Sequence, residues 1–380
     1  WALILRAQAF LRFTDIYGPF PLSMNADNTE VYTSQRDIYL QLIKDLNEAT
    51  TYISSDTHLA KNMIAFAPYD LVYKGDFNKW RKFANSLKLR IAVRISNVEP
   101  TLARSLAEQA VRDGVIEGNE DNCAIHYNKS GLWTTAVSWG DSRVCADIEC
   151  YMTGYKDPRM SMYFLQPMTA GQRKYIGCRA GAAIGSNVVA KRLYSTVNVQ
   201  ETTPSLWLTA SEMAFCKAEG VLRGWNMGGG TAKEYYERGV TLSFNQWGVD
   251  GVATYLLDDT STEANYADAL GGFGGAAAKV STITIKWDDN APMDEKMERL
   301  ITQKWIALFP NGQEAWNEIR RTGYPRIFSV PQATNGYTLL TPNRIPFDKN
   351  QQINNRSNYD KAVELLGGPD DYATPMWWQR

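Results

Sequence analysis

Histidine and cysteine, two residue types that often perform catalysis or bind metals, are present in small numbers. The chain has two histidines, His58 and His126, which supply a His-based triad or a multi-histidine metal site poorly. Its five cysteines include no Cys-x-x-Cys pair, so neither a zinc ribbon nor a thioredoxin-like site is indicated. We interpret most cysteines as small buried apolar side chains and leave open one disulfide, Cys145–Cys150. We therefore expect no metal and no cofactor.

Two pairs of adjacent carboxylates, Asp258–Asp259 and Asp288–Asp289, fall in expected loops. We interpret them as solvated turns, with a calcium contact as the less favoured alternative. The paired acids of a glycosidase usually come from distant segments, so their spacing does not identify them. The chain also lacks the motifs GxxxxGK[ST] and HExxH and an EF-hand loop. These observations favour a protein that is not an enzyme, with a helical glycoside hydrolase as the rival.

The most distinctive candidate site is the segment 127–143, YNKSGLWTTAVSWGDSR. It places Trp133 and Trp139 in a polar setting without helical spacing, which favours their exposure. An indole can stack on the C–H face of a pyranose ring while polar neighbours bind the hydroxyls. The polar candidates here are Asn128, Asp141 and Arg143. The alternative is that both indoles pack within the loop. Weaker aromatic candidates of the same kind are Trp207, Trp225, Trp247 and Trp287.

The charge and hydropathy of the chain exclude several classes of partner. Its 380 residues carry 40 basic and 41 acidic side chains, a net charge of −1, and the pI is about 6.3. We therefore do not expect the protein to bind nucleic acid or anionic lipid mainly through its charge. With 44% hydrophobic residues and a mean hydropathy of −0.36, the composition is that of a globular protein with a large core.

The elements that must position these residues are mostly helices. Apolar residues recur at helical spacing in four segments, which we expect to form helix pairs: 1–54, 78–113, 209–246 and 294–323. In the clearest helix, one apolar face carries core residues Trp80, Phe83 and Leu87. Loop-rich insertions, expected to face the ligand, cover 118–208 and 249–290. Within the second insertion, residues 280–287 (VSTITIKW) are expected to form a small β-ribbon.

The hairpin of residues 213–244 resembles a tetratricopeptide unit, with the Gly-rich stretch 224–230 as its turn. The period between pairs is not constant, so a regular solenoid is disfavoured. The sequence predicts an all-α protein made of divergent tetratricopeptide-like helix pairs. These pairs would form a right-handed superhelical scaffold with long irregular loop insertions and minor β-ribbons.

Two further groups of residues are interpreted as structural. Trp305 and Trp316 lie at core positions of their helices, and their neighbours are expected to form a buried ionic network that specifies geometry: Glu314, Arg320 and Arg321. The adjacent indoles of Trp377 and Trp378 are assigned to packing or to a contact of the C-terminal tail.

Five segments, in order along the chain, resemble motifs of the SusD/RagB family of Bacteroidetes. The longest is ITQKWIALFPNGQEAWNEIRRTGYPRI at 301–327, and the next is GDFNKWRKFANSLKLRIAVRIS at 75–96. The others are LRAQAFLRFTDIYGPFPL, KDPRM and SEMAFCKAEGVLRGW, at 5–22, 156–160 and 211–225. The family's lipobox cysteine and first helical segment are absent from these residues. The resemblance therefore covers 1–380 as a single SusD-like domain without its N-terminal part.

The resemblance implies a lipoprotein exposed on the outer membrane, attached only through an upstream lipid anchor. It also implies a non-enzymatic role in which the protein binds glycans and delivers them to a SusC-type TonB-dependent transporter for nutrient uptake. Two alternatives remain for the ligand and activity: a non-glycan nutrient such as a peptide, or a helical glycoside hydrolase. A third reading is a tetratricopeptide scaffold for peptides, although such arrays lack these motifs and such long loops.

Overall fold

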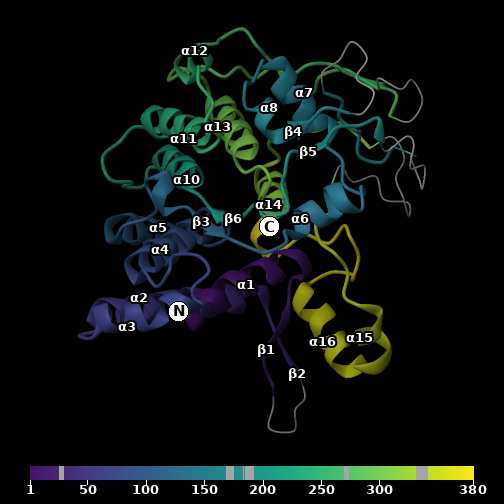
Figure 1. Cartoon of the computed structure of the whole chain (residues 1–380). Coiled ribbons are helices and arrows are strands. Elements are labelled where there is room, and N and C mark those ends of the chain that lie inside the picture. The colour runs from purple at the N-terminus through teal and green to yellow at the C-terminus, as the bar shows by residue number, and fades with distance from the viewer. Residues whose placement is uncertain (25–29, 168–174, 183, 185–191, 269–273, 331–340) are drawn as a thin grey trace. The chain divides into compact units, whose positions relative to one another are not determined.

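The computed structural model describes all residues except 25–29, 168–174, 183, 185–191, 269–273 and 331–340 (Figure 1). The chain divides into two compact units. Unit 1 contains Trp1–Ile116, Gly224–Gly228 and Thr341–Arg380, and unit 2 contains Glu117–Arg223 and Gly229–Leu340. Helices dominate both units and the described strands form only two-stranded ribbons, so the all-α class expected from the sequence is confirmed.

Unit 1 is built from two helix pairs and a C-terminal segment. Helix α1 packs on α2, and α4 packs on both α2 and α5. An antiparallel ribbon of β1 (Phe20–Met24) and β2 (Glu30–Thr33) follows α1. The helices are α1 (Ala2–Tyr17), α2 (Gln35–Ser55), α3 (Leu59–Phe66), η1 (Ala67–Tyr69), α4 (Phe77–Arg94), α5 (Pro100–Asp113), α15 (Lys349–Asn354), α16 (Arg356–Leu366) and η5 (Trp377–Gln379).

Helix α4 supplies much of the core of unit 1. It begins where the Asp76 side chain accepts hydrogen bonds from two backbone N–H groups of the first turn, the usual N-cap arrangement. The indole N–H of Trp80 donates to the carboxylate of Asp70 at 2.8 Å. The apolar face predicted from helical spacing is fully buried at Trp80, Phe83 and Leu87.

A buried carboxylate, Asp15 of α1, connects four elements of unit 1. It pairs with Arg94 of α4 and accepts hydrogen bonds from the Tyr39 hydroxyl of α2 at 2.5 Å and from the Trp378 indole of η5 at 3.1 Å. The Arg94 guanidinium also lies 5.4 Å from the centroid of the Trp378 ring. Trp378 is fully buried, as the packing interpretation of this residue requires.

Unit 2 combines two long helix pairs with shorter elements. Helix α10 packs on both α11 and α13. Antiparallel ribbons join β3 to β6, β4 to β5 and β7 to β8. The helices are η2 (Asn119–Asp121), α6 (Gly131–Trp133), η3 (Thr134–Ser138), α7 (Ala146–Gly154), α8 (Met160–Tyr163), α10 (Ala210–Leu222), α11 (Ala232–Gln246), α12 (Val252–Leu256), α13 (Met293–Ala307) and α14 (Gly312–Thr322). The strands are β3 (Cys123–Ile125), β4 (Phe164–Leu165), β5 (Thr196–Val197), β6 (Ser205–Leu208), β7 (Tyr266–Ala267) and β8 (Ala276–Ala277).

A glycine, Gly239 of α11, allows close packing against α10 in the helix hairpin. A Cβ atom at Gly239 would lie 2.8–2.9 Å from the ring of Phe215, so the ring fills the space that a side chain would need. The Ser211 hydroxyl donates to the Gly239 carbonyl at 2.7 Å. Helix α11 begins with a capping box between Thr231 and Glu234, which satisfies the first N–H groups of the helix.

The prediction of a β-ribbon at residues 280–287 is wrong. The segment alternates between exposed and buried side chains as a strand would, but it pairs with no strand among the residues that the structure describes. Side chains bind its backbone instead: the hydroxyls of Tyr155 and Tyr236 donate to the carbonyls of Ile283 and Ile285 at 3.0 and 2.5 Å. Because side chains satisfy these buried polar groups, the extended segment needs no ladder.

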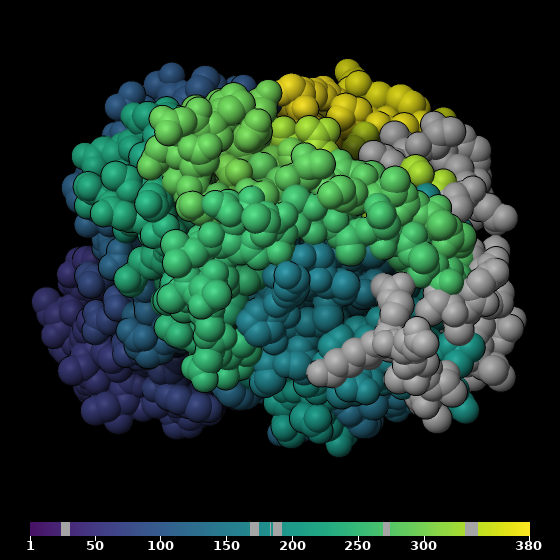
Figure 2. All heavy atoms as spheres, turned by 90° about the horizontal axis from the view of Figure 1, so that it is seen from above, coloured from purple at the N-terminus to yellow at the C-terminus, as the bar shows by residue number. Residues whose placement is uncertain are grey.

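Part of the insertion 249–290 lies directly over α7. Figure 2 shows the green insertion crossing the blue-teal segment that holds α7 and α8, and the backbone N–H of Ala264 donates to the Cys150 carbonyl at 3.0 Å. A Cβ atom at Gly154 would lie 2.0 Å from the Thr262 carbonyl. Glycine at this position therefore permits the close approach of the two segments.

All five cysteines are free, so the Cys145–Cys150 disulfide that the sequence left open is not formed. Cys123, Cys150 and Cys216 are buried, in agreement with the interpretation of cysteines as small apolar side chains. Burial raises the pKa of the Cys216 thiol to about 12, so this side chain stays protonated and unreactive at neutral pH.

Replacement of Trp80 tests the core of unit 1. We expect Trp80→Ala to lower the free energy of unfolding by about 3–5 kcal/mol, because it removes a fully buried indole and leaves a cavity. Urea unfolding followed by circular dichroism measures this loss. Tyr69→Ala is the control, since Tyr69 is 73% exposed and its removal should change stability by less than about 0.5 kcal/mol. Equal stability of Trp80→Ala and wild type would contradict the core assignment.

Candidate functional site

The predicted binding segment, residues 127–143, contains more helix than its sequence suggested. The expectation of a loop without helical spacing is corrected by α6 and by the π-helical turn η3. The backbone N–H of Trp139 donates to the Thr134 carbonyl at 2.8 Å, a bond spanning five residues rather than four. The wider turn shifts the phase of the side chains, so the indoles of Trp133 and Trp139 do not follow the spacing of an ordinary helix.

Hydrogen bonds hold this segment against residues 195–201. The backbone N–H of Ser130 donates to the Glu201 carbonyl at 2.7 Å, and that of Val144 donates to the Ser195 carbonyl at 2.9 Å. Between these points, the Thr196 hydroxyl lies 3.3 and 3.1 Å from the carbonyls of Ala136 and Ser142. The segment is therefore fixed at both ends and in the middle, which suits a preorganised binding surface.

The two predicted tryptophans differ in how much of the indole reaches solvent. Trp139 is 68% exposed, whereas Trp133 is half-buried and has the Lys129 ammonium 5.2 Å from its ring centroid. An exposed indole of this size on a fixed backbone is available to stack on a flat apolar surface. Of the two predicted stacking residues, Trp139 has the geometry for this role.

The predicted polar partners also lie on this segment. Asn128 and Asp141 are exposed and Arg143 is half-buried. Desolvation lowers the pKa of Arg143, and the nearby Asp141 carboxylate opposes that shift. A guanidinium carries hydrogen-bond donors and a carboxylate carries acceptors, so the segment offers both within a few residues of Trp139.

Unit 2 also contains a cavity of about 540 Å³ that the sequence did not reveal. Helix α7, which lines it, begins three residues after Arg143. The volume falls in the range of small-molecule sites. Its lining combines two thioethers and one aromatic ring with several polar side chains: Glu149, Met152, Thr153, Lys156, Asp157, Pro158, Met160, Ser161 and Tyr175. The KDPRM motif, which contributes four of these residues, was the available sequence signal.

One wall of this cavity is held by a buried ion pair. Both nitrogens Nε and Nη2 of Arg159 donate to the Asp157 carboxylate, at 3.0 and 2.5 Å. Arg159 also donates to the Ser243 hydroxyl of α11 at 2.9 Å, and the Tyr255 hydroxyl of α12 donates to Asp157 at 2.9 Å. The motif therefore fixes the α7–α8 turn to α11 and α12, which is a structural role.

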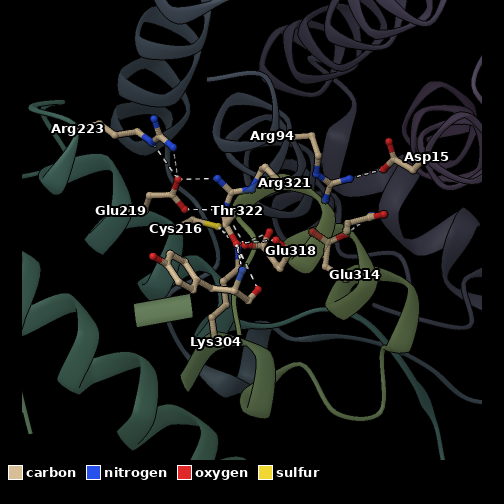
Figure 3. Close-up of polar contacts among 12 residues, drawn as sticks. Asp15, Arg94, Cys216, Glu219, Arg223, Lys304, Glu314, Glu318, Arg321 and Thr322 are labelled. Carbon is tan, nitrogen blue, oxygen red and sulfur yellow. Dashed lines mark hydrogen bonds and ion pairs between the residues drawn. The ribbon is translucent and has the colours of Figure 1, made fainter. Parts of the chain in front are cut away.

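A second buried network lies between α10, α13 and α14 (Figure 3). The Arg321 guanidinium binds both carboxylate oxygens of Glu219, at 2.7 and 2.8 Å, and also Glu318 at 2.6 Å. Glu318 receives the Lys304 ammonium at 3.0 Å, and Glu219 receives Arg223 at 2.8 Å. The sequence correctly placed Arg321 in a buried network, but it did not identify Glu219 and Glu318 as its partners.

The network keeps its carboxylates charged although they are buried. Burial alone would raise the pKa of Glu219, but Arg321 and Arg223 outweigh that effect and hold the pKa at about 2. For Glu318, burial is likewise outweighed by Arg321 and Lys304, which lower its pKa. The two carboxylates bind three cations, Arg321, Arg223 and Lys304. Hydrogen bonds occupy both oxygens of Glu219, so the site holds helices together rather than performing proton transfer.

Arg320 and Glu314, the other predicted members, have different surroundings. The Arg320 guanidinium lies 3.5 Å from the centroid of the Trp316 ring and donates to the Asn317 amide oxygen. The Asn317 side chain in turn donates to Glu314 at 3.2 Å. Both predicted residues are buried, as expected.

Glu219→Gln tests the network. We expect it to lower the free energy of unfolding at pH 7 by about 3–5 kcal/mol, because the buried Arg321 loses one of its two carboxylate partners and Arg223 loses the carboxylate that it binds. The folded pKa of about 2 lies below the unfolded value of about 4.3, so the stabilisation is present above about pH 4.3 and is lost as pH falls towards 2. Urea unfolding between pH 7 and pH 3 should give a shallower decline for Glu219→Gln than for wild type.

The control for this measurement is Glu201→Gln. Glu201 is half exposed and its ion pair with Lys129 is 3.9 Å long, so its removal should change stability by less than about 0.5 kcal/mol. Parallel pH profiles of wild type and Glu219→Gln would show that the network does not set the acid stability.

Within the described part of the chain, no group of three or more His, Cys, Asp or Glu side chains is placed to hold a metal ion. A separate search of the same residues finds no helix that combines the length and the apolar composition needed to cross a bilayer.

The SusD-like family, described as Susd and RagB outer membrane lipoproteins, matches residues 1–379 of this chain. A comparison with curated proteins finds no significant match to this chain. Solved structures match closely. A SusD homologue from Bacteroides thetaiotaomicron has 38% sequence identity and a TM-score of 0.92, with coverage of 100% of this chain and 81% of that chain.

Two further structures have similar scores. A chitin-binding SusD homologue from Flavobacterium johnsoniae has 38% identity and a TM-score of 0.92, and covers 100% of this chain and 80% of its own. A SusD homologue from Bacteroides uniformis has 39% identity and a TM-score of 0.90, with the same coverage.

Proposed function

The chain belongs to the SusD-like family of outer-membrane lipoproteins, and on this basis we propose that it binds glycans at the cell surface without altering them chemically. The observation that carries the proposal is its 38% identity, over its whole length, to a chitin-binding SusD homologue. A 68% exposed indole on a fixed segment, Trp139, supports it. Glycans present flat C–H faces that such a ring can cover.

We place the glycan against residues 128–143. The indole of Trp139 stacks on one pyranose face, while Asn128 and Asp141 bind hydroxyl groups at the edge of the ring. Arg143 donates further hydrogen bonds from its half-buried position. Trp133 acts mainly by supporting the segment, because its ring is half-buried beside Lys129. The arrangement combines one apolar platform with several polar groups, as sugar sites require.

Trp139→Ala tests this placement. A glycan array that includes chitooligosaccharides first identifies the best ligand, and calorimetry then measures its affinity. Loss of a stacked indole should cost about 1–3 kcal/mol, which is about a 5- to 150-fold weaker Kd. The melting temperature should barely change, because the side chain lies on the surface. Trp133→Ala should weaken binding less and lower stability more.

Tyr69→Ala is the matched control for Trp139→Ala. Tyr69 is also strongly exposed, at 73%, but belongs to unit 1, so its removal should leave the affinity within about twofold. Unchanged affinity in Trp139→Ala would place the glycan elsewhere, with the α7–α8 cavity as the next location. An array without any binding would contradict the glycan proposal and favour a peptide ligand.

We further propose that binding is not followed by hydrolysis. The segment offers a stacking platform and single polar groups, and the carboxylates of Glu219 and Glu318 are engaged in ion pairs away from solvent. Incubation of the best array ligand with the protein, followed by chromatography, should yield no shorter product. Product that increases with protein concentration and disappears on one carboxylate substitution would support the helical glycoside hydrolase instead.

The family also suggests the partner and the organisation of the chain. We propose that the protein delivers its glycan to a SusC-type TonB-dependent transporter, and that 1–380 act as one SusD-like domain. The insertions 118–208 and 249–290 would face the ligand, since the first of them carries Trp139. Co-purification of the protein with such a transporter from outer membranes tests this part of the proposal.

A further inference from the structure

Two of the five cysteines, Cys145 and Cys178, lie directly opposite each other in unit 2. They form an isolated parallel β-bridge. The backbone N–H of Cys178 donates to the Val144 carbonyl at 2.8 Å, and that of Ala146 donates to the Cys178 carbonyl at 2.9 Å. Residues opposed in this way place their side chains on the same face of the pair. Both cysteines are partly exposed, whereas the other three are buried.

The spacing of the two backbones suits a disulfide. Paired strands lie about 4.7–4.9 Å apart, and the Cα atoms of disulfide-bonded cysteines are about 4.4–6.8 Å apart. A Cβ atom at Gly177 would lie 2.6 Å from the Cα atom of Ala146, so glycine beside Cys178 permits a close approach of the segments.

Formation of the bond requires a small movement. Opposed residues of a sheet have Cβ atoms about 4.5–5.5 Å apart, so a disulfide must draw them together by about 1 Å. The bridge lies outside the named strands of the described part of the chain. No described ladder of neighbouring pairs therefore resists that movement.

The two thiols have different surroundings. Burial and the Asp147 carboxylate raise the pKa of the Cys145 thiol well above its usual range, and this thiol donates to Asp147 at 2.9 Å. Burial and the Asp268 carboxylate raise the pKa of the Cys178 thiol to about 11, but the Arg143 guanidinium opposes this shift. A nearby cation favours the thiolate, which is the reactive form. Cys178 is therefore the more reactive of the two.

We propose that Cys145 and Cys178 are a redox pair that forms an intramolecular disulfide on reaction with a disulfide-bearing oxidant. The Cys178 thiolate attacks one sulfur of the oxidant, and the other sulfur of the oxidant leaves as a thiolate. The Cys145 sulfur then attacks the Cys178 sulfur, the new bond forms, and the second thiolate leaves. The two cysteine protons end on the two released thiols, so the cysteines lose two electrons and the oxidant gains them.

The location described for the family suits such a pair. Outer-membrane lipoproteins meet the oxidising conditions of the periplasm, where disulfides persist. The bond would tie the start of α7, whose N-cap is Cys145, to the segment that holds Cys178. The inference uses the family's location and does not depend on glycan binding at residues 128–143.

The test uses the full chain, reduced with dithiothreitol and then incubated at pH 9 with oxidised glutathione. We expect the free thiols, titrated after denaturation, to fall from five to three, and peptide mapping to identify Cys145–Cys178. The melting temperature should rise by about 5 °C, because the crosslink restricts the unfolded chain. Since the Cys178 thiolate attacks first, the rate should rise about tenfold between pH 7 and pH 8.

Two variants separate this pair from other cysteine chemistry. Cys145→Ser should stop the reaction after its first step and leave a glutathione adduct on Cys178. Cys150→Ala is the matched control, because it removes a buried cysteine and should leave the rate of crosslinking within about twofold. Five remaining thiols in the folded wild type, a Cys145–Cys150 crosslink, or a glutathione adduct that persists on Cys178 of the wild type would overturn the proposal.

Discussion

The geometry of unit 2 depends on the Arg321 guanidinium, which is buried between two carboxylates. Glu219 belongs to α10 and Glu318 to α14. Lys304 of α13 forms an ion pair with Glu318. A charge taken out of water is tolerable only when its partners are in place, so the three helices are constrained to one relative arrangement. The segment that carries Trp139 belongs to this same unit.

Regular features of the fold could be predicted because each rests on local periodicity or on a long motif. The apolar face at Trp80, Phe83 and Leu87 is buried as its spacing requires. The prediction of a strand at 280–287 was wrong, because alternation of apolar and polar residues indicates which side chains are buried but not whether the backbone pairs with another strand. Hydroxyls of Tyr155 and Tyr236, distant in sequence, bind its carbonyls. Likewise, the partners of Arg321 could not be read from the sequence, since Glu219 lies 102 positions away.

The candidate binding surface was predictable in composition but not in conformation. Two tryptophans in a polar segment suggested exposure, and Trp139 is exposed while Trp133 is half-buried. Trp133 ends α6 and lies beside Lys129, and the π-helical turn separates it from Trp139. Neither feature has a sequence signal. The α7–α8 cavity depends on helix packing, so only the fragment KDPRM pointed towards it. This cavity has a mixed lining, with Met152, Met160 and Tyr175 beside polar side chains.

The most direct measurement is saturation-transfer difference NMR of the best-binding oligosaccharide from the array. If Trp139 stacks on the sugar, the C–H protons on one face of a single pyranose ring should receive the most saturation, and this pattern should disappear in Trp139→Ala but persist in Tyr69→Ala. Saturation spread evenly over all ring protons, or a pattern identical in Trp139→Ala and wild type, would contradict glycan capture on residues 128–143.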